Sequence, residues 1–374
     1  MKKFVCAIML ACAVQMLSLS ALPQTALGAP VTGPLTSQEL QQLTALNPID
    51  THTHIFQRSP EFYSMLKKLN LHTLDILVID GTAPPMNDIA WERKNAWDVA
   101  QGSSGRIALC TSFDPYKIGQ PGFTKEAIRQ VNQDFANGAI AVKIWKNIGL
   151  EIKDSKGQYI MPDDPAFEPI YKDIAAHNKT LIAHIADPNT IWEAPNPDAP
   201  DYDYYKRNPQ WYMYNKPDVP SKAQILKARD HMLEQNPNLR VVGAHLGSME
   251  VDFKQLGDHF DRYPNFAVDM AARMPFLMLK PRADVIAFVT KYQDRLIYGT
   301  DTEFDTKKPI QLQVSKWEEA YALDWRYLAT NDTVDYKGRK MQGLGLPASV
   351  LRKIYHENAV HWFPGILENS KETK

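Results

Sequence analysis

The feature that most constrains this chain is a regular alternation of short apolar runs with amphipathic helical segments. The apolar runs lie at 47–56, 73–79, 107–112, 139–145, 180–184, 240–245, 265–270 and 295–299. Helical periodicity is clearest at 125–135, 166–177, 222–234 and 283–292. Nearly continuous apolar strands separated by helices indicate parallel strands that are covered on both faces.

Eight such units over about 250 residues predict a single α/β domain folded as a (β/α)8 barrel, the TIM-barrel architecture. The alternative is a doubly wound open sheet, in which a glycine-rich phosphate loop often follows the first strand. No such loop follows residues 47–56, so the barrel is favoured. In a barrel, side chains at the carboxyl ends of the strands meet at one face, where active sites lie.

The N-terminal stretch has the pattern of an export signal. Lys2 and Lys3 precede an apolar segment, and Ala26-Leu27-Gly28 supplies small residues before a cleavage point. This pattern predicts a signal peptide over residues 1–28. An uncleaved membrane anchor is the alternative, but the apolar segment is short and is interrupted by Gln15.

The predicted signal divides the chain into three parts. An N-terminal arm is expected over 29–45 and the barrel domain over 46–374, in a protein that is exported to the periplasm or secreted. Of the three cysteines, Cys110 alone remains after cleavage, so no internal disulfide can form. Because Cys110 lies in an apolar run, we expect a buried and unreactive thiol.

Charge composition bears on the partners of this chain. The 42 Lys and Arg residues nearly balance the 43 Asp and Glu residues, for a formal net charge of −1. This balance gives no reason to expect nucleic acid or an anionic membrane as a partner. Neither nucleic acid nor membrane contact beyond the signal peptide is therefore expected, and the expected partner is the small-molecule substrate of the site described below.

A long segment over residues 186–220 interrupts the pattern between the fifth strand and its helix. It is rich in proline and contains the aromatic residues Tyr202, Tyr204, Tyr205, Trp211, Tyr212 and Tyr214. A long loop is usually functional or disordered, and the aromatic content argues against disorder. Two interpretations stay open: a packed surface flap, or a lid over the barrel mouth that supplies a stacking surface for a substrate.

Polar residues that can bind a metal occur at several predicted strand ends. His52 and His54 are one residue apart, so on a strand they point to the same face. His184 ends the fifth apolar run, His245 ends the sixth, and Asp301 follows the eighth. A single core histidine needs no function, but packing explains four such strand ends poorly. A nitrogen-rich set with one carboxylate suits zinc, and other first-row divalent metals are alternatives.

The motifs together resemble those of the amidohydrolase superfamily of metal-dependent barrels. They are Asp50-Thr51-His52-Thr53-His54, Ala183-His184-Ile185, Gly243-Ala244-His245-Leu246-Gly247, Gly299-Thr300-Asp301 and Ile354-Tyr355-His356-Glu357-Asn358-Ala359. The resemblance spans nearly all of the chain after the signal. It is strongest to the branch that contains aminocarboxymuconate-semialdehyde decarboxylase and resorcylate decarboxylases, and that also has hydrolases.

The resemblance implies a role for each strand-end residue. His52, His54, His184 and Asp301 would ligate the metal, and one ion is expected rather than two. His245 would polarise the substrate, so that His245 and Asp301 are the predicted catalytic residues. The resemblance also implies a homodimer.

Three basic residues are further candidates for the site. In binuclear members of the superfamily a carbamylated lysine on the fourth strand bridges two metals, and Lys143 lies in that run. Lys143 could instead bind a substrate carboxylate or pair with an acid. Lys146 and Arg273 are predicted to bind a substrate carboxylate, with a surface salt bridge as the alternative for Arg273. The remaining histidines, among them His72, are interpreted as helix, loop or surface residues.

Three functions fit these residues. The favoured one is a metal-dependent hydrolase of a small amide, ester or lactone that carries a carboxylate. In it, Asp301 moves the proton of an activated water and His245 stabilises the oxyanion. The first alternative is a nonoxidative decarboxylase of an aromatic or unsaturated acid. The second is an exported binding protein without activity, which the full set of ligand-competent residues disfavours.

Overall fold

The computed structural model describes residues 27–79, 81, 88–250 and 252–368. The predicted signal peptide therefore lies almost wholly outside the described residues, and it stays a prediction together with the proposed export. Within the described ranges, no helix combines the length and the apolar character that crossing a membrane requires.

A sheet of parallel strands forms the centre of the molecule, in the order β8-β7-β6-β5-β4-β3-β2-β1-β9. The strands are β1 (Ile49–Ile55), β2 (His72–Ile76), β3 (Ile107–Ser112), β4 (Ala139–Ile144), β5 (Thr180–Ala183), β6 (Arg240–Gly243), β7 (Phe266–Asp269), β8 (Leu296–Ile297) and β9 (Thr302–Phe304). The first eight lie within the predicted apolar runs or begin one residue before them. Their order around the sheet follows their order in the chain, as in a barrel.

The sheet closes through an interrupted last strand. β8 pairs with β7, whereas β9 pairs with β1, and residues 298–301 join the two short strands. Across this join, the backbone N–H of Thr51 donates to the Tyr298 carbonyl (3.1 Å), and the N–H of Asp301 donates to the His52 carbonyl (2.8 Å). The predicted TIM-barrel fold is thus confirmed.

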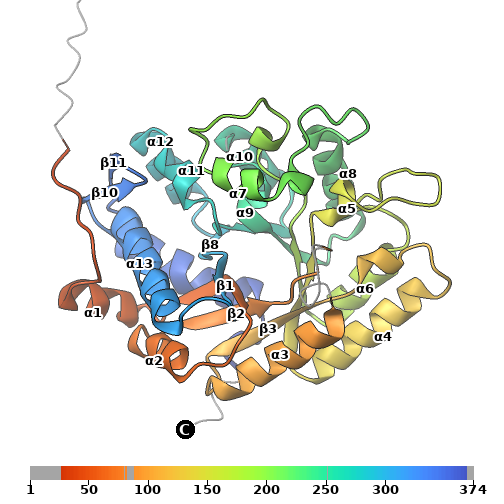
Figure 1. Ribbon diagram of the computed structural model, residues 1–374, viewed down its shortest axis with the longest axis horizontal. Coiled ribbons are helices and arrows are strands. Elements are labelled where there is room, and N and C mark those ends of the chain that lie inside the picture. The colour runs from red at the N-terminus through yellow and green to blue at the C-terminus, as the bar shows by residue number, and fades with distance from the viewer. Residues whose placement is uncertain (1–26, 80, 82–87, 251, 369–374) are drawn as a thin grey trace, which may run out of the picture.

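Helices surround the strands in a ring (Figure 1). The longer ones are α2 (Pro60–Lys68), α3 (Ile89–Gly102), α4 (Phe123–Ala136), α6 (Glu168–Ala176), α8 (Lys222–Gln235), α10 (Phe253–Arg262), α12 (Arg282–Lys291) and α13 (Ile310–Ala329). Each buries one apolar side; α4, for example, buries Phe123, Ala127 and Val131, which are four residues apart. The chain then ends in α14 (Ala348–Arg352), a π-helical turn (Lys353–Glu357) and α15 (Asn358–Trp362).

Apolar side chains fill the barrel below the strand ends. Ile182, Val242, Ala267 and Ile297 belong to one buried cluster inside the sheet, together with Cys110. Cys110 is a free, fully buried cysteine, and burial raises the pKa of its thiol, which confirms the expected unreactive core position.

His72 is not where the sequence interpretation placed it. It begins β2 rather than lying in a helix, in a loop or on the surface, and only 6% of the residue is exposed. Burial lowers the pKa of His72 to about 4, so the ring is neutral near pH 7. The interpretation failed because His72 precedes the apolar run instead of ending it.

Two segments stand over the carboxyl ends of the strands. Between β5 and α8 the chain passes through η2 (Asn189–Ile191), α7 (Tyr202–Arg207) and η3 (Pro209–Trp211). A hairpin of β10 (Thr333–Tyr336) and β11 (Arg339–Gln342) follows α13. Arg339 lies 3.5 Å from Asp198, so the hairpin touches the long loop at its surface.

The N-terminal arm packs on the barrel through α1 (Ser37–Ala45). Thr36 and Glu39 form a capping box at its start, and the Glu39 carboxylate accepts hydrogen bonds from Arg326 of α13 (2.8 and 3.0 Å).

Candidate metal centre

The two β1 histidines present the same ring nitrogen to one space. Nδ1 of His54 donates to the Ile76 carbonyl (2.9 Å), and Nδ1 of His52 lies 2.8 Å from an Asp269 carboxylate oxygen. A neutral imidazole that donates from Nδ1 keeps a lone pair on Nε2, the form that binds a metal. Both side chains are buried, and their shared face follows from the strand alternation.

Asp301 lies in the join between β8 and β9, with a left-handed φ of 65°. Its Oδ1 is 3.2 Å from Nε2 of His54 and 3.5 Å from Nε2 of His52. The carboxylate of Asp50 accepts hydrogen bonds from the backbone N–H (3.0 Å) and the hydroxyl (2.6 Å) of Thr300. Asp50, the first residue of the β1 motif, therefore fixes the turn that orients Asp301 toward His52 and His54.

Asp301 is ionised in this setting. Desolvation alone would raise the pKa of its carboxyl, but the hydrogen bond with Nε2 of His54 and the attraction of that ring hold the pKa well below its usual value. A carboxylate that stays ionised is competent both as a metal ligand and as a proton acceptor.

His245 follows β6 in a left-handed turn, with φ of 60°, and Leu246 follows with φ of 55°. Such backbone is costly for residues other than glycine, so it persists only where the surroundings hold it. Here Oδ1 of Asp269 accepts from the His245 N–H (2.8 Å), and Nδ1 of His245 donates to the Ala271 carbonyl (2.9 Å).

His184 follows β5 and is also buried. Its ring centre lies 4.4 Å from that of His245, and its Nε2 lies 3.1 Å from Oδ1 of Asp187. Its Nδ1 is buried and has no hydrogen-bond partner within the described part of the chain. A buried ring nitrogen without a partner is costly, and a metal ligand role would satisfy it.

These donors fit a divalent metal. Donor atoms of His52, His54 and Asp301 lie within 4.8 Å of one another, and so do those of His52, His245 and Asp269. Imidazole nitrogens with one or two carboxylates suit zinc and other first-row divalent ions. We call these five residues the strand-end cluster; His184 adjoins it through His245.

Lys143 points into the barrel. It is fully buried on β4, and its Nζ lies 3.1 Å from Nε2 of His52 and 4.8 Å from the centre of the Trp145 ring. Burial lowers the pKa of Lys143 to about 8, so the amine is still mostly protonated at pH 7 but loses its proton more readily than an exposed lysine. The structure thus settles the direction of this side chain, while a bridging role stays a prediction.

Lys146 and Arg273 lie beside the strand-end cluster, each facing a buried acid. Nζ of Lys146 lies 2.6 Å from Asp187, whereas Arg273 is 3.8 Å from both Asp187 and Glu250. All four side chains are buried. Arg273 is therefore not in a surface salt bridge. We call Lys146, Asp187, Glu250 and Arg273 the charged cluster.

One cavity of about 370 Å³ joins the two clusters. Its lining includes His54, His184, His245 and Asp301 from the strand ends, and Lys146 and Arg273 from the charged cluster. The long loop contributes Tyr204 and Tyr205 to the wall, and the hairpin contributes Tyr336. The predicted site residues therefore gather at one place; His52 and Lys143 do not line the cavity, but His52 adjoins it through Asp301 (3.5 Å) and Lys143 through His52 (3.1 Å).

Sequence reasoning missed three acids of this site, Asp269, Asp187 and Glu250. Asp269 ends β7 after an apolar run, so the strand-end rule that found the histidines could have found it too. Asp187 follows His184 by three residues, outside any strand, and no pattern marks it. Its role is visible only once Lys146, Arg273 and His184 are seen around it.

Comparison with known proteins gives one match to a family, described as amidohydrolase, over residues 49–365. No curated protein matches the chain significantly in sequence.

Several solved structures resemble the fold at low identity. A 2,6-dihydroxybenzoate decarboxylase from Rhizobium is 12% identical with a TM-score of 0.47, over 84% of this chain and 98% of that one. The 4-oxalomesaconate hydratase of Rhodopseudomonas palustris is 10% identical with a TM-score of 0.48, over 87% of this chain and 98% of that one. A dihydroorotase from Campylobacter jejuni is 11% identical with a TM-score of 0.42, over 84% and 82%. Similarity at this level assigns no reaction.

Proposed function

Because this chain belongs to the amidohydrolase family, we propose that it is a metal-dependent hydrolase. Its substrate would be a small amide, ester or lactone that carries a carboxylate. The observation that carries the proposal is the convergence of His52, His54 and Asp301, whose donor atoms lie within 4.8 Å of one another, with His54 and Asp301 on the wall of a cavity.

One divalent ion, zinc or another first-row metal, would be held by His52, His54, His184 and Asp301, with Lys143 as a further candidate ligand. When bound, such an ion polarises a carbonyl and lowers the pKa of water toward neutrality.

Asp301 is the proposed proton carrier. Its carboxylate is ionised and lies on the cavity wall. It would accept a proton from the attacking water and return that proton to the leaving atom as the bond breaks.

His245 faces the cavity through Nε2, because Nδ1 is committed to the Ala271 carbonyl. Burial lowers the pKa of His245 well below its usual value, so the free ring is neutral. It can donate to an oxyanion only after Nε2 gains a proton. We therefore propose that Nε2 takes up a proton from solvent as negative charge develops on the substrate oxygen, and releases that proton to solvent when the carbonyl re-forms.

The charged cluster would recognise the substrate carboxylate. Lys146 and Arg273 reach the cavity, and a third cation, Lys222, lies 3.6 Å from Glu250. Asp187 and Glu250 neutralise two of these three charges, so one substrate carboxylate would complete the balance.

A decarboxylase is the second candidate, because these cations would also hold a carboxylate beside the metal centre. Incubation of the zinc-loaded protein with ester, lactone and amide panels, and in parallel with aromatic carboxylic acids, separates the two. Hydrolysis of any panel member supports our proposal, whereas carbon dioxide release without hydrolysis favours the decarboxylase. Metal binding without either reaction would point to a binding protein.

We also propose that the protein is exported. N-terminal sequencing of the mature protein tests this, since cleavage after Gly28 predicts a chain that starts at Ala29. An N-terminus that still carries residues 1–28 would contradict it. For the proposed homodimer, light scattering would show twice the mass of one chain.

A further inference from the structure

The turn that presents Asp301 is held by hydrogen bonds from several directions. Asp301 has a left-handed φ of 65°, which is costly for a residue other than glycine and persists only where the surroundings enforce it. Its N–H donates to the His52 carbonyl (2.8 Å), and the Thr51 hydroxyl donates to the Tyr298 carbonyl (2.9 Å). From the opposite side, the N–H of Tyr298 donates to the Ile354 carbonyl in the π-helical turn (3.0 Å). The position of Asp301 therefore depends on contacts from outside the turn.

The carboxylate of Asp50 joins these contacts, and it is fully buried. Its Oδ1 accepts from the N–H groups of His52 (3.1 Å) and Thr300 (3.0 Å). Its Oδ2 accepts from the hydroxyls of Thr300 (2.6 Å) and Tyr321 (2.8 Å). Among the described residues, Tyr321 is the one side-chain donor to this carboxylate that lies outside β1 and the turn, because it stands on α13.

The Tyr321 hydroxyl is itself held in place. The residue is 4% exposed, and its ring packs against those of Trp317 (6.1 Å between centres) and Tyr298 (6.3 Å). Without this hydroxyl, Oδ2 of the buried Asp50 carboxylate would keep a single donor, the Thr300 hydroxyl, and the carboxylate would gain freedom to rotate. Thr300 directly precedes Asp301, so a rotation of Asp50 shifts the turn.

We propose that Tyr321 is a positioning residue for Asp301. Its hydroxyl fixes the carboxylate of Asp50, Asp50 fixes Thr300, and Thr300 sets the Asp301 carboxylate in front of His54. This chain of contacts couples α13, which lies in the outer ring of helices, to the strand-end cluster (Figure 1). The inference rests on the proposed function only in taking Asp301 as a metal ligand.

The test compares Tyr321→Phe with a matched control, Tyr298→Phe. Tyr298 is also buried, and its hydroxyl donates to a carboxylate oxygen of Asp324 on α13 (2.9 Å). Each variant removes one buried hydrogen bond between a tyrosine hydroxyl and a carboxylate, so both should lower the Tm by a similar amount. Only Tyr321 bonds to the carboxylate that holds Thr300.

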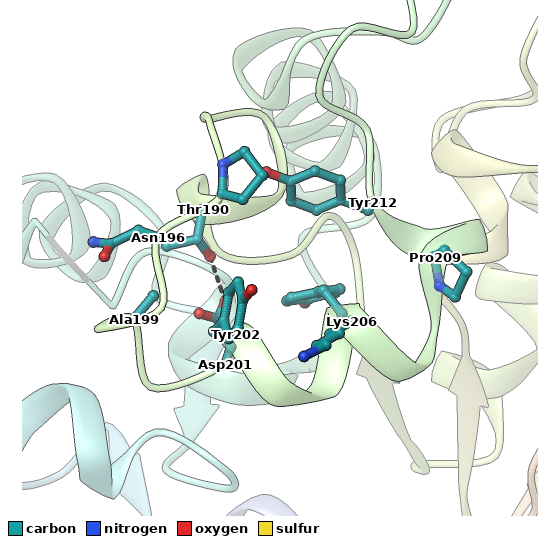
Figure 2. Close-up of a pocket in the computed structure, with 10 residues that line it drawn as sticks. Thr190, Asn196, Ala199, Asp201, Tyr202, Lys206, Pro209 and Tyr212 are labelled. Atoms are coloured by element: carbon teal, nitrogen blue, oxygen red, sulfur yellow. Dashed lines mark hydrogen bonds between the residues drawn. The ribbon is translucent and has the colours of Figure 1, made fainter.

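A second control, Thr190→Val, lies in the long loop. Figure 2 shows the hydrogen bond from the Thr190 hydroxyl to the Asp201 carboxylate as a dashed line. Asp201 lines the cavity at the metal centre, but in the described part of the chain it makes no hydrogen bond to the turn that holds Asp301. This variant shows whether the loss of any hydroxyl–carboxylate bond beside the cavity is enough to weaken the site.

Zinc affinity, measured by competition with a chelator, is the first readout. We expect it to fall about tenfold in Tyr321→Phe, the lower end of the loss seen when a partner of a metal ligand is removed. Tyr298→Phe and Thr190→Val should keep the affinity of the unchanged protein. An unchanged affinity in Tyr321→Phe, or an equal loss in Tyr298→Phe, would overturn the positioning role.

Crystal structures of the zinc-free variants separate this inference from the proposed function, because they need neither metal nor turnover. Tyr321→Phe should displace the Asp301 carboxylate from its place 3.2 Å from Nε2 of His54, and Tyr298→Phe should not. If Asp301 moves in this way but the unchanged protein binds no zinc, the positioning role stands and the metal-dependent function fails. If Asp301 keeps its place in Tyr321→Phe, the positioning role fails, whatever the protein binds.

Discussion

The strand-end cluster and the charged cluster border the same cavity but are built differently. In the strand-end cluster, Nδ1 of His52, His54 and His245 each has a partner at 2.8–2.9 Å. In the charged cluster, the Lys146–Asp187 pair is short, but both ion-pair contacts of Arg273 are 3.8 Å. Both carboxylate oxygens of Glu250 lack hydrogen-bond partners within the described residues.

This difference suits the strand-end cluster to metal binding and catalysis, and the charged cluster to substrate binding. The histidines and Asp301 stand on β-strands or at their ends, where the backbone ladder and hydrogen-bonded partners hold the donor atoms before anything binds. The charged residues stand on loops beyond the strands, and their long contacts leave hydrogen-bonding capacity for a ligand. We therefore expect substitutions in the first cluster to affect metal binding and turnover, and those in the second to affect substrate affinity.

The largest expected effect comes from Asp301→Asn. Because the amide cannot carry the proton and is a weaker ligand, kcat should fall by about 10²–10⁴-fold. Steady-state kinetics on a substrate identified from the panels measures this, with the exposed Asp258→Asn on α10 as the matched control. A variant that keeps its full kcat would remove Asp301 from the mechanism.

Metal removal should have the next largest effect, and it should act through the strand-end cluster. An ion present at about 100–1,000 times its Kd stabilises the folded chain by about 3–4 kcal/mol. Thermal unfolding with and without a chelator should show this as a lower Tm for the metal-free protein. An Arg273→Lys variant should show the same shift, since Arg273 belongs to the other cluster. If chelation leaves Tm unchanged, no tightly held ion contributes to the fold.

Asp269→Asn tests whether the partners of the histidines matter. The amide oxygen of this variant can still accept the hydrogen bond from the His245 N–H. The amide NH2 group then takes the position of Oδ2 and faces Nδ1 of His52. Because Nδ1 of His52 would then have to accept that hydrogen bond, the ring would carry its proton on Nε2. Nε2 would lose the lone pair that binds the metal. Metal affinity, measured by competition with a chelator, should fall by about 10–100-fold. Unchanged affinity would show that Asp269 does not orient His52.

The smallest effect is expected in the charged cluster. Arg273→Lys keeps the charge but loses the planar guanidinium, so KM for a carboxylate-bearing substrate should rise about tenfold while kcat and metal content stay nearly constant. Comparison with the same substrate as its methyl ester, on which the variant should act normally, supplies the control. A change in metal content would contradict the division between the clusters.

The features that recur along the chain, the apolar strands and the polar residues at their carboxyl ends, could be predicted from the sequence alone. Strand periodicity and the position of polar residues at strand ends were enough for the barrel and for the placement of His52, His54, His184, His245 and Asp301 around one cavity. The same rule also applies to Asp269, which ends β7 and was not among the predicted residues.

The remainder depends on geometry that no local pattern carries. The alternation of faces along β4 does not say which face is inside, so the inward direction of Lys143 needed the structure. Asp187 and Glu250 lie on loops, and only the folded chain brings them to Arg273. The left-handed turn at His245 is held by Asp269 and Ala271 from the neighbouring strand and the loop after it, which are contacts that sequence spacing does not reveal.

Anomalous diffraction from crystals of the zinc-loaded protein tests the proposed metal centre most directly. We expect one strong peak at the barrel mouth, about 2.0–2.3 Å from nitrogens of His52, His54 and His184 and an oxygen of Asp301. Crystals that bind zinc elsewhere, or that hold none at these four side chains under saturating metal, would contradict it.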